Sequence, residues 1–341
     1  MTTQAVTQRG PVTLTSHPLQ RVGAFALMSL AGVDDPDRDP ESLTSAEFEA
    51  AVAVMRANVA ATAELPDSKA SGAFWLSASY LLWPNSPMNW SGRAKASPQR
   101  RRELIEAWRT YPRDRIGAPC SLCGSDACGW YGKVDIPLGA SVYHRNTTAP
   151  GHQGQPLCAG CLGSLHALPY GCHIGPTAYT VHSWDDAFLR RATIRQVPRT
   201  RAHAAADDRL KAPARGEREA DALDAVAEHD RALAADIELI EFSNSNRDPF
   251  LKTWTLRQTV AEWIRCVRRD PESTAALEAL TRVVATPKFG ATRFAHMAFR
   301  APDRVLAATA DHLYTAGPGE GIDLDETAVI ARLCISLARV L

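Results

Sequence analysis

The chain has 341 residues, 45% of them hydrophobic, and its 38 basic residues balance its 38 acidic ones. This length allows two or three domains, and the composition is ordinary for a globular protein rather than for a disordered or fibrous one. The neutral net charge excludes a surface that is basic throughout, so any contact with nucleic acid has to come from local basic patches.

The first twenty residues are polar and threonine-rich, without the charged and then apolar pattern of a secretory signal. The apolar run at residues 22–33 is too short to span a bilayer. We therefore expect a cytoplasmic protein without a membrane segment, in a compartment where cysteines are kept reduced.

Helix signals are frequent in the first hundred residues. Thr44 and Glu47 have the spacing of a capping box, which predicts a helix start. That helix would bury a stripe made of Phe48, Val52, Met55 and Val59. Ser97 followed by Pro98 predicts a further helix start.

Two pairs of cysteines, each with two residues between its members, follow this region. The pairs are Cys120 with Cys123 and Cys158 with Cys161. Two thiolates at this spacing can share one metal ion, and two such pairs supply the four soft ligands of a closed tetrahedral zinc site. Four thiolates leave no open position for water or substrate, so the spacing predicts structural zinc.

Other interpretations of the cysteines remain open at this point. A redox-active pair is the main alternative to a metal site. Cys128 and three histidines, His144, His152 and His166, are possible substitutes for one ligand. Cys172, Cys266 and Cys334 have apolar neighbours in the sequence, which indicates buried packing residues.

The rest of the chain predicts an α+β fold. Residues 179–183 and 192–197 alternate as short strands do. Residues 202–216 have the composition of an exposed linker. A helix is expected from about Glu217, and residues 237–242 favour a strand. From Leu256 onward the pattern is helical, with a last helix that begins near Asp325. We expect a mixed α/β region at 1–115, a zinc-finger-like region with short strands at 116–200, a linker, helix and strand at 201–254, and a mainly helical region at 255–341.

Basic residues gather in two stretches, one before and one after the region that holds the two cysteine pairs. Each stretch contains three arginines beside an apolar element: Arg100, Arg101 and Arg102 on the helix that begins at Pro98, and Arg190, Arg191 and Arg195 beside the strand expected at 192–197. Such patches are compatible with contact to the phosphates of nucleic acid. Solvated arginine-rich faces explain the same composition equally well.

The common catalytic motifs of nucleotide-binding, metalloprotease and hydrolase families are absent from the sequence. An HNH-like nuclease held together by zinc would keep its catalytic residues between the two cysteine pairs. That interval lacks the adjacent Asp-His pair of such nucleases and offers Asp135, His144, Arg145, Asn146 and His152. We therefore expect no enzymatic activity. A zinc-ribbon nuclease or redox protein, and a zinc-stabilised adaptor without nucleic-acid contact, remain as alternatives.

Four separated stretches, taken together and in this order, resemble a known family. They are residues 17–23 followed by the helix start at Leu43 and Thr44, residues 82–89, the double cysteine pair with residues 168–172 and 181–183, and residues 241–245. The chain resembles the large subunit of type I CRISPR interference complexes (Cascade), in the I-A/I-B branch that carries a zinc-finger-like double pair of cysteines. The resemblance covers about residues 15–255.

The resemblance implies a subunit that contacts the guide RNA handle, reads the short motif that flanks the DNA target and helps to open the duplex in antiviral defence. It also implies partners: other subunits of the complex, guide RNA, target double-stranded DNA, and a recruited nuclease-helicase or transposition factor. The chain departs from the family in length, because only about 85 residues follow Leu256. That departure raises the question whether separate small subunits cover the displaced strand.

Overall fold

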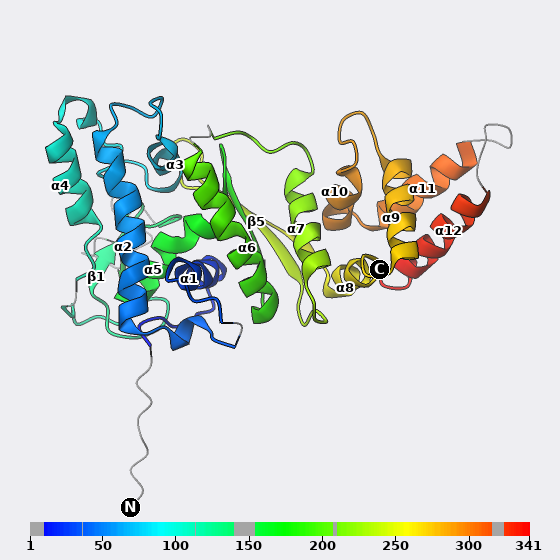
Figure 1. Ribbon diagram of the computed structural model, residues 1–341, viewed down its shortest axis with the longest axis horizontal. Helices are drawn as coiled ribbons and strands as arrows, with labels where there is room; N and C mark the ends of the chain where they lie inside the picture. Colours follow the sequence, from blue (N-terminus) through cyan, green and yellow to red (C-terminus); the bar gives the residue numbers. More distant parts are fainter. Residues whose placement is uncertain (1–9, 36, 113, 140–153, 207–209, 316–323) are drawn as a thin grey trace, which may run out of the picture. The chain divides into compact units, whose positions relative to one another are not determined.

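The computed structural model describes residues 10–35, 37–112, 114–139, 154–206, 210–315 and 324–341 (Figure 1). The chain divides into two compact units. Unit 1 comprises Met1–Thr180, Thr193–Ala212 and Glu241–Leu251, and unit 2 comprises Val181–Ala192, Pro213–Ile240 and Lys252–Leu341. The boundary expected at residue 115 therefore falls within unit 1.

Unit 1 is built around helix α1 (Pro18–Leu30), which packs against α2 (Ser45–Ala61) and α5 (Ala159–Ala167) (Figure 1). Almost every residue of α1 is buried. A Cβ atom at Gly23 would lie 1.8 Å from the carbonyl oxygen of Ser164, so the close contact between α1 and α5 requires glycine.

Helices α2 and α4 of unit 1 begin where local signals place them. The capping box at Thr44 and Glu47 is confirmed, and the predicted stripe of α2 is buried. Helix α3 (Phe74–Leu82) precedes Pro84, and α4 (Pro98–Trp108) begins after Ser97, whose hydroxyl accepts a hydrogen bond from the backbone of Arg100. Short 3-10 helices span η1 (Pro40–Ser42), η2 (Thr62–Glu64), η3 (Arg93–Lys95) and η4 (Leu168–Gly171).

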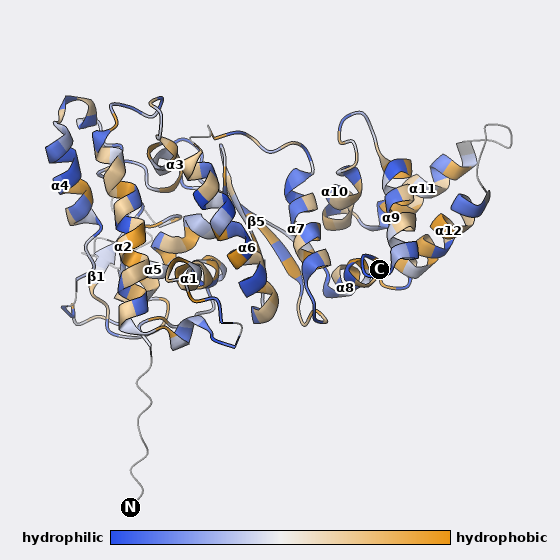
Figure 2. Ribbon diagram, viewed as in Figure 1, coloured by the Kyte–Doolittle hydropathy of each residue, from blue (hydrophilic) through white to orange (hydrophobic). Residues whose placement is uncertain are grey.

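Two sheets are formed by the described residues. Strands β1 (Gly129–Tyr131) and β2 (Gln155–Leu157) pair antiparallel, with Gly129 opposite Leu157. The second sheet has the order β3-β4-β5-β6, from β3 (His173–Ile174), β4 (Ala178–Ser183), β5 (Ile237–Ser243) and β6 (Phe250–Leu256). Strands β4 and β5 confirm the strands predicted at 179–183 and 237–242, whereas β6 was not predicted. Figure 2 shows β5 as largely hydrophobic, in keeping with its burial.

The strand expected at 192–197 is wrong, because these residues belong to helix α6 (Asp186–Ala205). Thr193, Val197 and Thr200 are buried, and their spacing of four and three residues is that of one helix face. Their β-branched side chains favour strands locally, but burial of these three residues on one face stabilises a helix instead. The first residues of the expected linker, 202–205, form the last turn of α6.

The C-terminal part is helical, as predicted. Unit 2 contains α7 (Glu217–Glu228), α8 (Gln258–Val267), α9 (Pro271–Val284), α10 (Arg293–Arg300), α11 (Asp303–Thr315) and α12 (Leu324–Ala338). Helix α7 packs on α8 and α10, and α9 packs on α11 and α12. The predicted starts of α7 and α12 are confirmed.

The fold class is α+β. The prediction of a mixed α/β region at 1–115 needs one correction. The described residues of that region form helices and no strand, and the first strand begins at Gly129. Apolar residues recur there at helical spacing, which explains the difference. Among the described residues, no helix has the length and apolar character to cross a bilayer.

Candidate metal centre

The four predicted cysteines come together in unit 1. The sulfur atoms of Cys120, Cys123, Cys158 and Cys161 all lie within 4.8 Å of one another. The sulfur atoms of Cys123 and Cys158 lie 3.5 Å apart, and all four cysteines are free thiols. A disulfide would require about 2.0 Å between the sulfurs. The arrangement is therefore that of four ligands around one metal ion rather than that of a covalent bridge.

The first pair lies on a tight turn of the backbone. The backbone N–H of Gly124 donates to the carbonyl of Cys120 at 2.9 Å, and Gly124 has a φ of +76°. This left-handed conformation favours glycine, and it lets the chain reverse directly after Cys123. The N–H of Ser121 donates to the carbonyl of Pro156 at 2.9 Å, which ties the turn to β2.

The second pair lies at the start of α5. Cys158 is the N-cap residue, and its sulfur accepts a hydrogen bond from the backbone N–H of Cys161 at 3.4 Å. The positive end of the helix dipole and this N–H both favour negative charge on sulfur. These two local features favour the thiolate of Cys158, whereas hydrogen bonding to Cys120 raises the pKa of both Cys158 and Cys161 in the metal-free site.

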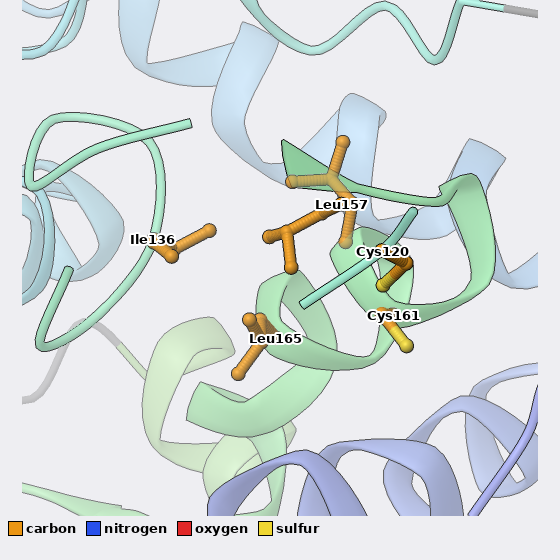
Figure 3. Packing of buried hydrophobic residues seen from close by; sticks show 6 residues of the cluster. Cys120, Ile136, Leu157, Cys161 and Leu165 are labelled. Carbon is orange, nitrogen blue, oxygen red and sulfur yellow. The ribbon is translucent and has the colours of Figure 1, made fainter. Parts of the chain in front are cut away.

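A small apolar cluster supports the site from one side. Cys120, Ile136, Leu157, Cys161 and Leu165 are buried in it together with Leu162. In Figure 3 the sulfur atoms of Cys120 and Cys161 lie close together at one end of the cluster, and Ile136 lies at the other. The cluster excludes water from one side of the ligands and fixes their backbone positions.

The donor set fits a metal ion. Four thiolates about 2.3 Å from one ion in a tetrahedron lie about 3.8 Å apart, close to the observed sulfur separations. Without an ion, the thiols have to share protons: hydrogen bonds from Cys158 and then Cys161 lower the pKa of Cys120, while the bond to Cys120 raises the pKa of Cys161. A cation would remove this conflict, because it stabilises all four thiolates at once.

The alternative ligands do not join the four sulfurs. The Cys128 thiol lies 3.3 Å from the carbonyl of Leu157, which it can reach as a donor, and it is absent from the cluster of four. His144 and His152 lie outside the described residues. His166 is buried, and both of its ring nitrogens have hydrogen-bond partners other than the sulfurs.

His166 belongs to a buried polar network beside the metal centre. Its Nε2 lies 3.1 Å from the carbonyl oxygen of Asp135, and its Nδ1 lies 2.6 Å from the hydroxyl of Tyr111. A carbonyl can only accept, so Nε2 carries the proton and Nδ1 accepts from Tyr111. Burial, and then the charge of Arg109, hold the pKa of His166 well below its usual value, so this imidazole is neutral.

Arg109 is the element of this network that sequence reasoning missed. Its guanidinium lies 4.3 Å from the ring centre of Trp83 and 3.8 Å from that of Trp108. Burial lowers the pKa of Arg109 to about 10, and the Trp108 indole donates to the carboxylate of Asp135 at 3.1 Å. In the sequence, Arg109 is one of several arginines in a basic stretch, and nothing local distinguishes this buried one.

The first arginine cluster separates into two kinds of side chain. Arg100 pairs with Glu103 at 3.3 Å and Arg102 pairs with Glu64 at 2.6 Å, all at exposed positions. Arg101 is only 8% exposed and donates to the backbone carbonyl of Leu65, after the end of η2. Arg101 thus caps a helix end, whereas Arg100 and Arg102 face solvent on α4, which Figure 2 shows as largely hydrophilic.

The second arginine cluster lies on α6 rather than beside a strand. Arg191 is exposed and pairs with Asp230 at 3.2 Å, while Arg190 and Arg195 are partly buried. Arg191 and Arg195 are one helical turn apart, so they share a side of the helix. Among these six arginines, the structure therefore leaves Arg100, Arg102 and Arg191 as the exposed ones.

The other cysteines differ in burial. Cys172 is buried as predicted, and burial raises the pKa of its thiol. Cys334 is partly buried. The prediction for Cys266 is wrong, because it lies exposed on α8 with its sulfur 3.6 Å from a carboxylate oxygen of Glu262.

Comparison of the chain with models of known protein families, with curated proteins and with solved structures finds no match.

Proposed function

We propose that this chain is the large subunit of a type I CRISPR RNA-guided complex of the I-A/I-B branch. One observation supports the proposal most: sequence stretches that carry the resemblance, although far apart in the chain, meet in the core of unit 1. Helix α1, which includes residues 18–23, packs against η4 (Leu168–Gly171), and Asn244 donates to the carbonyl of Leu82 at 2.8 Å. Stretches of the resemblance that lie far apart in the sequence therefore pack against one another in the folded chain.

In this role the subunit contacts the guide RNA handle, reads the flanking motif and helps to open the target duplex. Base pairing with the guide then supplies most of the sequence specificity. The subunit works in the cytoplasm with the other subunits of the complex, guide RNA and target double-stranded DNA, and a nuclease-helicase or a transposition factor is recruited to act on the DNA. The chain itself has no catalytic role in this proposal.

We assign zinc to the metal centre, with a structural role. Four thiolates in tetrahedral arrangement suit zinc or an iron–sulfur centre, and zinc is the usual choice for two paired cysteine turns. Of the described residues between the pairs, Ile136 and Leu157 belong to the apolar cluster beneath the sulfurs. A bound ion would hold the two ends of the segment between the pairs together with a free energy of about 10 kcal/mol coupled to folding.

Contact with phosphates is assigned to the exposed arginines of the two clusters. Arg100 and Arg102 project from α4, and their pairing with glutamates at the surface is weak enough to be exchanged for phosphate. Arg191 has the same kind of exposed partner, Asp230. The buried position of Arg101 makes it a support for α4 rather than a direct contact.

Purification of the assembled complex tests the proposal. The tagged chain is expressed with the genes that neighbour it in its genome and with a CRISPR array, and the RNA that copurifies is sequenced. We expect RNA of uniform length that carries a repeat-derived handle, and none when the array is omitted. If the neighbouring subunits assemble on guide RNA and bind target DNA without this chain, while the folded chain stays free, the proposal is wrong.

A further inference from the structure

A cavity in unit 1 that none of the four cysteines lines has the features of a ligand site. It has a volume of about 310 Å³ and is lined by α2, α3 and the last turn of α6. Val54, Asn58, Trp75, Arg201 and Ala205 are among its lining residues. This volume lies in the range of small-molecule pockets and far exceeds the voids left by ordinary packing.

One wall carries a hydrogen-bond donor without an acceptor. Trp75 is 6% exposed, yet its indole N–H makes no hydrogen bond to any described residue. A buried indole N–H usually has a partner. The indole nitrogen is not sealed from solvent, and Trp75 lines the cavity. The N–H donor is therefore available to a molecule bound there.

The rim carries a positive charge without a counter-ion. Arg201 is exposed at the end of α6, and no described residue forms an ion pair or hydrogen bond with its guanidinium. No acidic residue appears among the described lining residues. The cavity is therefore electrostatically suited to an anion, and its apolar walls, such as Val54 and Ala205, suit an uncharged body.

The walls are held in place before any ligand arrives. The Trp75 ring packs on Tyr170 with a centroid distance of 4.6 Å, and the hydroxyl of Tyr170 accepts a hydrogen bond of 2.7 Å from the side-chain amide of Asn58. Burial raises the pKa of Tyr170 to about 12, so this hydroxyl stays protonated near neutral pH. Preorganised walls reduce the entropy lost on binding.

We propose that this cavity binds a small organic anion with a flat apolar body, with its anionic group on Arg201 and an acceptor atom on the indole N–H of Trp75. A free aromatic carboxylate and a nucleotide share this chemistry. The proposal stands on the cavity alone and does not rest on the proposed function of the chain.

Titration of the full-length protein with three probes tests the site: benzoate, uridine monophosphate and inorganic phosphate. The indole N–H signal of Trp75 is followed by NMR and is identified by its loss in Trp75→Phe. We expect benzoate, uridine monophosphate or both to shift this signal. Arg201→Gln should weaken that binding by about tenfold or more, as expected for loss of a charge-assisted hydrogen bond.

Arg56→Gln is the matched control, since Arg56 is an exposed arginine of α2 that does not line the cavity. Arg201 is also exposed, so its variant tests the site even if Trp75→Phe is unstable. A shift with benzoate supports a free organic anion, and a shift with uridine monophosphate alone supports a nucleotide. Absence of any shift, a shift that Arg201→Gln leaves unchanged, or binding of phosphate alone without a Trp75 response overturns the proposal.

Discussion

The side-chain amide of Asn244 donates a hydrogen bond of 2.8 Å to the carbonyl oxygen of Leu82, which lies 162 positions earlier in the chain. Asn244 is 2% exposed, and the same amide nitrogen reaches the carbonyls of Lys133 at 3.1 Å and Ile136 at 3.4 Å. One side chain therefore connects the end of α3, the segment between the cysteine pairs and the end of β5.

Replacement of Asn244 by alanine should lower the free energy of unfolding by about 1–3 kcal/mol, because it leaves buried carbonyls without a donor. Chemical denaturation followed by circular dichroism measures the change. Asn246→Ala, at an exposed position two residues later, is the control and should have little effect. Equal midpoints for the two variants would contradict the structural role of Asn244.

Replacement of Cys120 by serine should abolish most metal binding and make the protein sensitive to protease, because three thiolates no longer complete the site. Elemental analysis should find about one zinc ion per chain in the wild-type protein. Cys128→Ser is the control, since this thiol contacts the carbonyl of Leu157 and should not be needed for the ion. Well-folded wild-type protein with little metal would refute the site.

Acid should weaken unit 2 through His229, which is 1% exposed and whose ring nitrogens form no hydrogen bond with any described residue. Burial is the largest cause that lowers its pKa in the folded state. Below about pH 6.5 the unfolded chain binds a proton that the folded chain does not, so the free energy of unfolding falls as the pH falls through this range.

His229→Phe keeps an aromatic ring against Phe188 and removes the titration. We expect this variant to lose less stability between neutral and mildly acidic pH than the wild type, as measured by urea unfolding. His312→Gln, at an exposed position of α11, should retain the wild-type pH dependence. An unchanged pH dependence in His229→Phe would show that other groups dominate.

The exposed arginines of α4 should contribute to DNA affinity without choosing the flanking motif. In the assembled complex, the double variant Arg100→Ala with Arg102→Ala should bind target DNA more weakly, and the salt slope should fall by about one per lost phosphate contact. Arg282→Ala removes a comparable exposed ion pair, with Glu326, and serves as the control. Unchanged affinity and slope would mean that the α4 arginines are merely solvated.

Arg101→Ala should behave differently from its neighbours. Its side chain donates to the carbonyl of Leu65, so its loss should lower the thermal stability of the chain before any effect on DNA is measured. An Arg101→Ala variant with wild-type stability and weakened DNA binding would return Arg101 to the set of phosphate contacts.

Several features could be predicted because they depend on residues a few positions apart. The spacing within each cysteine pair identified the four sulfurs that the structure brings within 4.8 Å of one another. The capping box at Thr44 and Glu47 and the start of α4 at Ser97 follow from side chains that bond to backbone groups within the same turn. Strand β5 was recognisable from its apolar residues Ile237, Leu239, Ile240 and Phe242.

Other features depend on contacts between distant parts of the chain, and only the tertiary structure decided them. Arg101 and Arg102 are neighbours in the sequence, but Arg101 is buried against Leu65 and Arg102 meets solvent and Glu64. Residues 192–197 alternate as a strand would, yet they form part of α6, where the hydroxyl of Thr200 donates to the carbonyl of Cys172 at 2.8 Å. Local preference is worth only a fraction of a kcal/mol per residue, so the burial of one helix face outweighs it.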